Sequence, residues 1–130
     1  MPTPPFRADI VGSFLRPAEL AEARRGFASG QIDADGLRRV EEAAIAELVQ
    51  NQADAGLQLA TDGEFRRAWW HFDFFGLLEG VDIVALDHGI QFQGVETKPH
   101  GIEVSGKIGF PDNHLFLDHF RSLKSLLENT

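Results

Sequence analysis

The chain has 130 residues, of which 43% are hydrophobic and 25% are charged, a composition typical of a soluble globular protein. Twelve Lys and Arg against twenty Asp and Glu give a formal net charge of −8, which argues against a nucleic-acid-binding surface and against a face for anionic membranes. Cysteine is absent, so the chain forms no disulfide and cannot build a thiolate zinc site by itself. The N-terminus lacks signal-peptide features and no segment approaches the roughly 20 apolar residues of a membrane span, so we expect a cytoplasmic protein.

The first expected elements are a Pro-rich arm at residues 2–5, a short strand at residues 6–14 and a helix that begins near Pro17. Proline suits the first helical turn, and the acids of this helix precede its arginines, as the helix dipole favours. We expect Gly26 or Gly30 to end it.

The longest expected helix runs from residue 34 to residue 55, with Asp33 as its N-cap and Gly56 as its C′ residue. Its apolar residues recur at spacings of three and four and form one stripe, namely Leu37, Val40, Ala44, Ile45, Leu48 and Val49. We expect its polar residues to lie mainly on the opposite side, namely Glu41, Glu42, Glu47 and Gln50.

A second short strand is expected at residues 57–61, which makes a strand, helix, strand order with a right-handed crossover. The aromatic segment at residues 65–79 predicts a short helix. Strand-like residues at 81–84, 90–95 and 101–110 predict antiparallel strands. An amphipathic helix is expected at residues 114–128.

These elements predict an α/β protein with a single domain over residues 1–130. Two parallel strands cannot close a (β/α)8 TIM barrel, which needs eight strands and about 250 residues. We therefore expect either a small open sheet or the N-terminal fragment of a larger barrel. The chain ends without a glycine or basic helix-terminating signal, which favours the fragment.

A polar segment at residues 61–67, Thr-Asp-Gly-Glu-Phe-Arg-Arg, directly follows the second expected strand. Ligand sites of parallel α/β proteins lie at the carboxyl ends of strands, and this mixture of charges suits a zwitterionic small molecule. In one interpretation Glu64 faces a pocket and binds a cation or an ammonium group. In the alternative, Asp62 and Glu64 form salt bridges with Arg66 and Arg67 in a solvated turn.

A second candidate site is Val11-Gly12-Ser13, at the end of the first expected strand. Glycine allows a close backbone approach, and the following amides and hydroxyl could hold a carboxylate or phosphate. The alternative is a simple turn before a helix. The two candidate sites reinforce each other, because the carboxyl ends of neighbouring parallel strands meet at one mouth.

Other chemical motifs are missing from the sequence. The five histidines lack the spacing of metal ligands, and no nucleotide-binding glycine motif occurs. We predict no metal site and no catalytic residue within this chain. The Phe/Trp cluster at residues 65–78 could bind a flat ring, but core or interface packing, including self-association, is the more common role.

The segments at residues 7–17 (Arg-Ala-Asp-Ile-Val-Gly-Ser-Phe-Leu-Arg-Pro), 56–57, 61–67 and 70–74 together resemble the catalytic domain of cobalamin-independent methionine synthase. The resemblance is greatest to short, single-domain bacterial relatives, the methyltetrahydropteroyltriglutamate–homocysteine methyltransferase-like proteins. It covers most of residues 6–80 and, more loosely, residues 81–128. It implies a TIM barrel of which this chain supplies the first strands and helices and an antiparallel β excursion.

The resemblance also implies a substrate site. In the family, the turn after the first strand binds the amino-acid part of homocysteine, which points to Val11, Gly12 and Ser13. The glutamate after the second strand binds its ammonium group, and that position is Glu64. Asp62, Arg66 and Arg67 are then expected to support Glu64.

The family's reaction is a methyl transfer from a folate-type donor to a zinc-bound thiol. Zinc makes the thiol a nucleophile near neutral pH. The family's zinc ligands come from later strands and include cysteines, so zinc is expected only in a full-length parent, and this chain alone should be inactive.

Two rival hypotheses use the same residues differently. A thiol alkyltransferase of the epoxide–coenzyme M type would need cations for a sulfonate, and Arg16, Arg66 and Arg67 would then matter more than Glu64. A non-catalytic binding or assembly module would instead use the Phe/Trp cluster as an interface.

Overall fold

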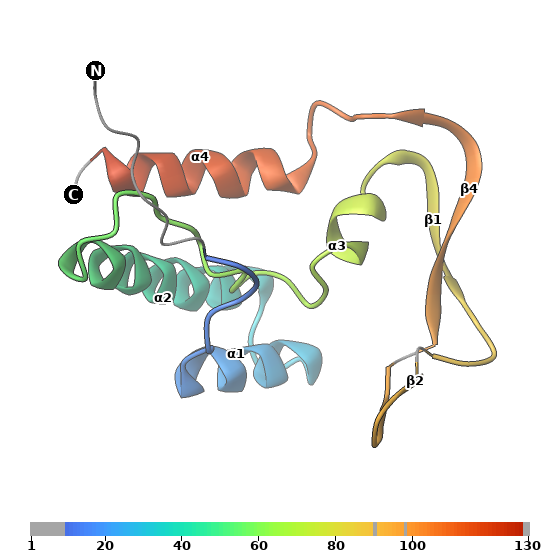
Figure 1. Ribbon diagram of the computed structural model, residues 1–130, viewed down its shortest axis with the longest axis horizontal. Coiled ribbons are helices and arrows are strands. Elements are labelled where there is room, and N and C mark those ends of the chain that lie inside the picture. The colour runs from blue at the N-terminus through green and yellow to red at the C-terminus, as the bar shows by residue number, and fades with distance from the viewer. Residues whose placement is uncertain (1–9, 90, 98, 129–130) are drawn as a thin grey trace. The chain divides into compact units, whose positions relative to one another are not determined.

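The computed structural model describes residues 10–89, 91–97 and 99–128. Its internal contacts divide the chain into two compact units, residues 1–67 with 120–130 and residues 68–119 (Figure 1). The Pro-rich arm and the part of the first expected strand that precedes residue 10 lie outside the described residues. The mixture of helices and strands agrees with the sequence-based expectation at this level.

The first unit is helical. It contains α1 (Ala18–Ala28), α2 (Ala34–Asp54) and the C-terminal turns of α4 (Leu115–Leu127). The expected caps of α2 are confirmed: Asp33 accepts a 2.7 Å hydrogen bond from the Gly36 amide, and Gly56 has φ 80°. The helix α1 extends to Ala28, and Gly30 follows it with φ 74°.

The core of this unit joins the two helices to the polar segment at residues 61–67. Leu20, Ile45, Val49 and Phe65 are fully buried, and Leu123 and Leu126 of α4 pack against them. Because Phe65 lies inside the segment itself, burial of its ring anchors the neighbouring charged residues to the helices. The segment is therefore part of the folded core rather than a free loop.

The two expected parallel strands are wrong for the described residues. Neither residues 10–14 nor residues 57–61 form a strand. A strand requires a neighbour to pair its backbone groups, and here the side-chain amide of Gln52 takes that place. Gln52 accepts a 3.0 Å bond from the Thr61 amide and donates one of 3.0 Å to the Thr61 carbonyl. This satisfies the backbone without a sheet.

The second unit contains α3 (Phe72–Phe75), β1 (Glu79–Ala85), β2 (Gln91–Phe92), β3 (Val95–Glu96) and β4 (His100–Gly109). The expected antiparallel strands at residues 81–84 and 101–110 are confirmed, whereas the segment expected at residues 90–95 forms two short strands, β2 and β3, rather than one. The strands β1 and β4 pair with Val81 opposite Val104 and Ile83 opposite Ile102, and β2 pairs with β3. The helix α3 is much shorter than the expected helix at residues 65–79, since the residues before it form turns.

His114 organises the aromatic residues of this second unit. It is 1% exposed, its Nδ1 accepts a 3.2 Å bond from the Phe116 amide, and its Nε2 lies 3.1 Å from the Phe74 carbonyl. Since an amide can only donate, Nδ1 is the unprotonated nitrogen and Nε2 donates. The ring also stacks on Phe110 at 4.9 Å. His114 therefore has a structural role in this unit.

Candidate functional site

The segment at residues 61–67 forms a tight turn held by its own side chains. The Thr61 hydroxyl accepts a 3.0 Å bond from the Gly63 amide, and Asp62 Oδ1 accepts one of 3.0 Å from the Glu64 amide. Gly63 has φ 65° and Glu64 has φ 59°. Left-handed backbone at a non-glycine residue is costly and often marks a functional site. Among the described residues, Glu64 alone shows it outside glycine.

Gly63 is required for a second reason besides its backbone angle. A Cβ atom at this position would lie 2.5 Å from Leu48 Cδ2 of α2. Such contacts essentially do not occur, so a larger residue would push the turn away from the helix. The glycine thus lets the turn sit directly on α2.

The structure brings the two candidate sites together. The Phe14 amide donates a 3.1 Å hydrogen bond to the Gly63 carbonyl, so the residue that follows Gly12 and Ser13 contacts the residue that precedes Glu64. Val11, Gly12 and Ser13 are all exposed, and Gly12 has φ 84° with open space around its Cα. Their backbone amides and the Ser13 hydroxyl therefore remain accessible beside the Glu64 turn.

The acids of the turn share one arginine. Arg67 Nη2 lies 3.6 Å from Asp62 Oδ1, and its Nη1 lies 3.6 Å from Glu64 Oε1. This pairing is the salt-bridged turn that the sequence allowed as an alternative. The side chain of Glu64 is nevertheless 23% exposed, against 9% for Asp62, so Glu64 is the acid that a solute can reach.

Arg66 points to a different partner set. Its Nε lies 4.0 Å from Glu41 Oε2 and its Nη2 donates a 3.3 Å bond to Ser122 Oγ. Only 6% of its side chain is exposed. The expected support of Glu64 by Asp62 and Arg67 thus has direct contacts in the structure, whereas Arg66 supports the packing of α2 and α4.

Two arginines of the preceding segment and α1 also contact the turn. Arg16 donates to the Glu64 and Arg67 carbonyls, and Arg24 donates to the Phe65 and Arg67 carbonyls. Arg16 was considered above only as a partner for a sulfonate, and Arg24 was not singled out. Arg16 and Arg67 balance the charges of Asp62 and Glu64, an arrangement suited to a zwitterion.

Glu41 was expected on the polar side of α2, but the structure shows it buried. It is 9% exposed and lies 3.4 Å from Arg24 Nη2. Its position four residues before Ile45 and eight before Val49 places it at the edge of the apolar stripe, a signal that could have identified it. Burial raises the pKa of its carboxyl above the ordinary value of 4.5, and the coulombic attraction of Arg24 and Arg66 offsets part of that rise.

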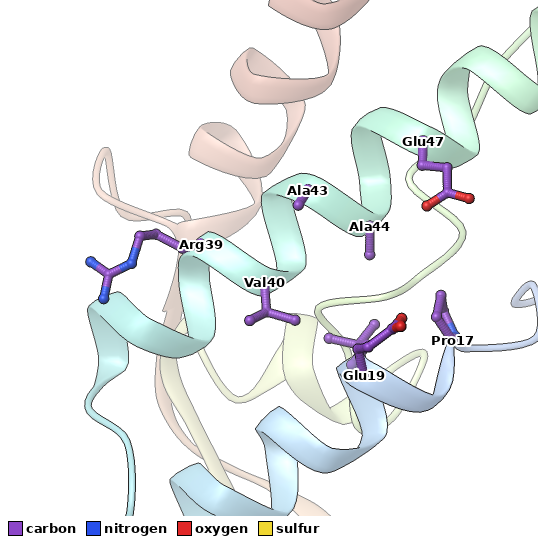
Figure 2. A pocket seen from close by; sticks show the side chains of 8 residues that line it. Pro17, Glu19, Arg39, Val40, Ala43, Ala44 and Glu47 are labelled. Carbon is purple, nitrogen blue, oxygen red and sulfur yellow. The ribbon is translucent and has the colours of Figure 1, made fainter.

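The first unit also has a hollow between α1 and α2. It has a volume of about 340 Å³ and is lined by Pro17, Glu19, Leu20, Arg39, Val40, Ala43, Ala44 and Glu47 (Figure 2). The side chain of Glu19 enters it from α1, and Val40 and Ala44 enter it from α2. None of the residues expected to bind substrate lines this hollow.

Zinc is implied by the family resemblance, and the residues present do not fit it. The sequence has no cysteine. Within residues 10–89, 91–97 and 99–128, no three His, Asp or Glu side chains are grouped so that they could hold a metal ion. A zinc centre would therefore need ligands other than those that the described residues bring together.

No helix in the described part of the chain is both long and apolar enough to cross a membrane.

Comparisons with known proteins found similar sequences and one similar structure. The chain is 47% identical over 123 residues to the uncharacterised protein YxjG of Bacillus subtilis. The aligned region makes up 95% of this chain and 32% of YxjG. A methionine synthase of Sulfolobus acidocaldarius is 33% identical over 58 residues, 45% of this chain and 17% of that protein. No protein-family model matches the chain.

A solved structure is also similar. It is a provisionally assigned vitamin-B12-independent methionine synthase from Listeria monocytogenes, with a TM-score of 0.73 and 39% identity over 94% of this chain. The chain spans about one third of the length of YxjG and of the Listeria protein, with 32% of each covered.

The fold is a mixed α/β fold, and the partial similarities to methionine synthases suggest a methyltransferase-like relationship. More narrowly, the partial similarities relate the chain to the cobalamin-independent methionine synthases.

Proposed function

We propose that this chain supplies the amino-acid-anchoring part of a homocysteine S-methyltransferase-like protein. Glu64 binds the ammonium group of homocysteine. The backbone amides of Gly12 and Ser13, with the Ser13 hydroxyl and the neighbouring Val11, bind its carboxylate. Charged hydrogen bonds of both kinds are strong and directional, so together they would orient the thiol.

The observation that carries this proposal is the Phe14–Gly63 hydrogen bond of 3.1 Å. It joins the exposed Gly12-Ser13 turn to the turn that holds Glu64. An α-amino acid presents its ammonium and carboxylate on one carbon, so it needs complementary groups from two neighbouring segments. The charge balance between Asp62, Glu64, Arg16 and Arg67 suits a zwitterion rather than a simple cation.

We infer further that the natural context of the chain is a larger TIM barrel. The exposed apolar side chains Val11 (91% exposed) and Leu59 (64%) lie within the two segments that were expected to be strands, and Leu15 (95%) directly follows the first. In a barrel these segments would gain strand neighbours and the side chains would be covered. The Listeria protein is longer than this chain, which matches 32% of it, and this supports the same inference.

The reaction proposed for the whole protein is methyl transfer from a folate-type donor to the thiol. Zinc would supply a nucleophilic thiolate at neutral pH, and its ligands would have to come from residues outside this chain. The residues of this chain bind and orient the amino-acid part of the substrate. The isolated chain is therefore expected to bind homocysteine without methylating it. Such a protein belongs in the cytoplasm, where folate-type donors are used.

A sulfonate thiol is a weaker candidate because its arginines are already engaged. Arg66 contacts Glu41 and Ser122, Arg67 contacts Asp62 and Glu64, and Arg16 donates to two carbonyls. A sulfonate would compete with these contacts for the same guanidinium groups. This is why homocysteine is preferred over a coenzyme M-type thiol.

Calorimetry on the chain tests the proposal. L-homocysteine should bind, and Glu64→Gln should weaken binding by about tenfold or more, because a charged hydrogen bond to the ammonium contributes about 1.5–3 kcal/mol. Glu22→Gln, at an exposed position of α1, is the matched control and should bind as the unaltered chain does. Equal binding by Glu64→Gln, or tighter binding of 2-mercaptoethanesulfonate than of homocysteine, would overturn the assignment.

A further inference from the structure

The guanidinium groups of Arg16 and Arg24 donate hydrogen bonds to backbone carbonyls of the Glu64 turn at residues 61–67. Arg16 Nη2 donates to the carbonyls of Glu64 (3.0 Å) and Arg67 (2.7 Å). Arg24 donates to the carbonyl of Phe65 through Nη2 (2.6 Å) and to that of Arg67 through Nη1 (3.2 Å). Three of the four carbonyls at residues 64–67 therefore point toward arginines from another part of the chain.

These contacts depend on the left-handed backbone of Glu64. The carbonyl of Glu64 belongs to the peptide unit that follows its own φ and ψ angles. If φ moved from 59° to the ordinary negative range, this peptide unit would turn and its carbonyl would leave Arg16. The Arg16 contact therefore requires the left-handed conformation of Glu64, and it stabilises that conformation in turn.

Two other hydrogen bonds that restrain Glu64 are local. Its amide donates to Asp62 Oδ1, and its carbonyl also accepts a 3.0 Å bond from the Arg67 amide. Both bonds lie within the turn and would move with it. Donors from other segments also reach the carbonyls of Thr61 (from Gln52) and Gly63 (from Phe14), but the carbonyls of Glu64, Phe65 and Arg67 are bound by arginines, and charged donors form the stronger hydrogen bonds.

We propose that Arg16 is a positioning residue that holds Glu64 in its left-handed conformation, with Arg24 as its second support. The functional consequence, that Glu64 presents its carboxylate to an ammonium group, rests on the proposed function. Arg16 follows Gly12 and Ser13 by only a few residues, so it also couples the carboxylate-binding turn to the ammonium-binding acid. The buried Nε of Arg16 has no hydrogen-bond partner among the described residues, so its Nη2 group carries these contacts.

The direct test is the backbone angle of Glu64 in an isotope-labelled chain without ligand, measured by NMR from its three-bond HN–Hα coupling and its intraresidue HN–Hα distance. Arg16→Met removes the donors and keeps the apolar length, and it should move Glu64 to negative φ. Arg16→Lys retains a charged donor and should preserve positive φ in part. Arg25→Met changes the exposed neighbour of Arg24 and should leave Glu64 unchanged.

A folded Arg16→Met chain in which Glu64 keeps its positive φ would overturn the proposal. If Arg16→Met does not fold, Arg16→Gln is measured in the same way. Its amide can serve one carbonyl, so a partial shift toward negative φ is required, and an unchanged angle again overturns the proposal.

A binding measurement separates this inference from the proposed function. Loss of the preferred conformation should lower homocysteine affinity roughly tenfold in Arg16→Met, since only the left-handed fraction binds and the left-handed penalty corresponds to about that factor. If the unaltered chain binds no homocysteine, the proposed function fails, while the NMR angle still decides the role of Arg16.

Discussion

The backbone amide of Phe14 donates a 3.1 Å hydrogen bond to the carbonyl of Gly63. This single bond joins two segments that are separated in the sequence by α1 and α2. Gly63 accepts it while packed against Leu48, and Glu64 follows in a left-handed conformation. The placement of the candidate site therefore depends on how closely the turn sits on α2.

Gly63→Ala should destabilise the chain by about 3 kcal/mol, because it adds left-handed strain and a clash with Leu48. Gly56→Ala is the matched control, since Gly56 has φ 80° and open space where a Cβ would lie. It should cost only about 1 kcal/mol. Urea denaturation measures both, and equal losses would show that the Leu48 contact does not matter.

Asp33→Ala should lower the free energy of unfolding by about 1 kcal/mol, since the N-cap bond to the Gly36 amide is lost. The bond is 2.7 Å long and caps the helix that carries Glu41, Ile45 and Val49. Asp35→Ala removes a nearby acid inside the first turn and should have a smaller effect. Denaturant midpoints for the two variants are compared at one pH, and a larger loss in Asp35→Ala would contradict the cap assignment.

Glu41 should make stability depend on pH. Burial raises the pKa of its carboxyl in the folded chain above 4.5, so the folded state binds more protons than the unfolded state between the unfolded and folded pKa values. The contribution of Glu41 to stability is therefore greatest at low pH and declines as pH rises through the folded pKa. Relative to the unaltered chain, Glu41→Gln should gain stability as the pH rises from about 4 to 7.

The pH comparison uses denaturant unfolding of both chains at each pH. Subtracting one curve from the other removes titrations that the two chains share. A difference that changes in the opposite direction would mean that the attraction of Arg24 and Arg66 outweighs desolvation at this site.

Substitution of Trp70 tests whether the chain self-associates through the Phe/Trp cluster at residues 65–78. Its side chain is 69% exposed, whereas Phe65 of the same cluster is buried in the core. If the cluster forms an interface, Trp70→Ala should raise the dissociation constant of the dimer about 30-fold, as expected for an aromatic anchor. Leu86→Ala, at another half-exposed apolar position, is the control. Sedimentation equilibrium would contradict the interface if the unaltered chain is monomeric throughout.

Several features followed from sequence alone because they depend on neighbouring residues. The spacing of Ile45 and Val49, the cap at Asp33 and the glycine at 56 together determine α2, since helix formation needs only local bonds. The alternating residues after Gly80 predicted antiparallel strands, but not that β1 pairs with β4. The charged turn at residues 61–67 and its glycine could also be located, and so could the Gly12-Ser13 turn.

The tertiary structure decided which partners those residues have. Strands at residues 10–14 and 57–61 did not form, because strand pairing needs a distant neighbour and Gln52 satisfies Thr61 instead. Spacing cannot show that Arg66 turns toward Glu41 while Arg67 remains with Glu64. The sequence by itself thus determined the chemical groups and the helices. The contacts of Arg16 and Arg24 with the Glu64 turn arise only when α1 packs against α2, because a guanidinium group binds a carbonyl only at the right distance and direction.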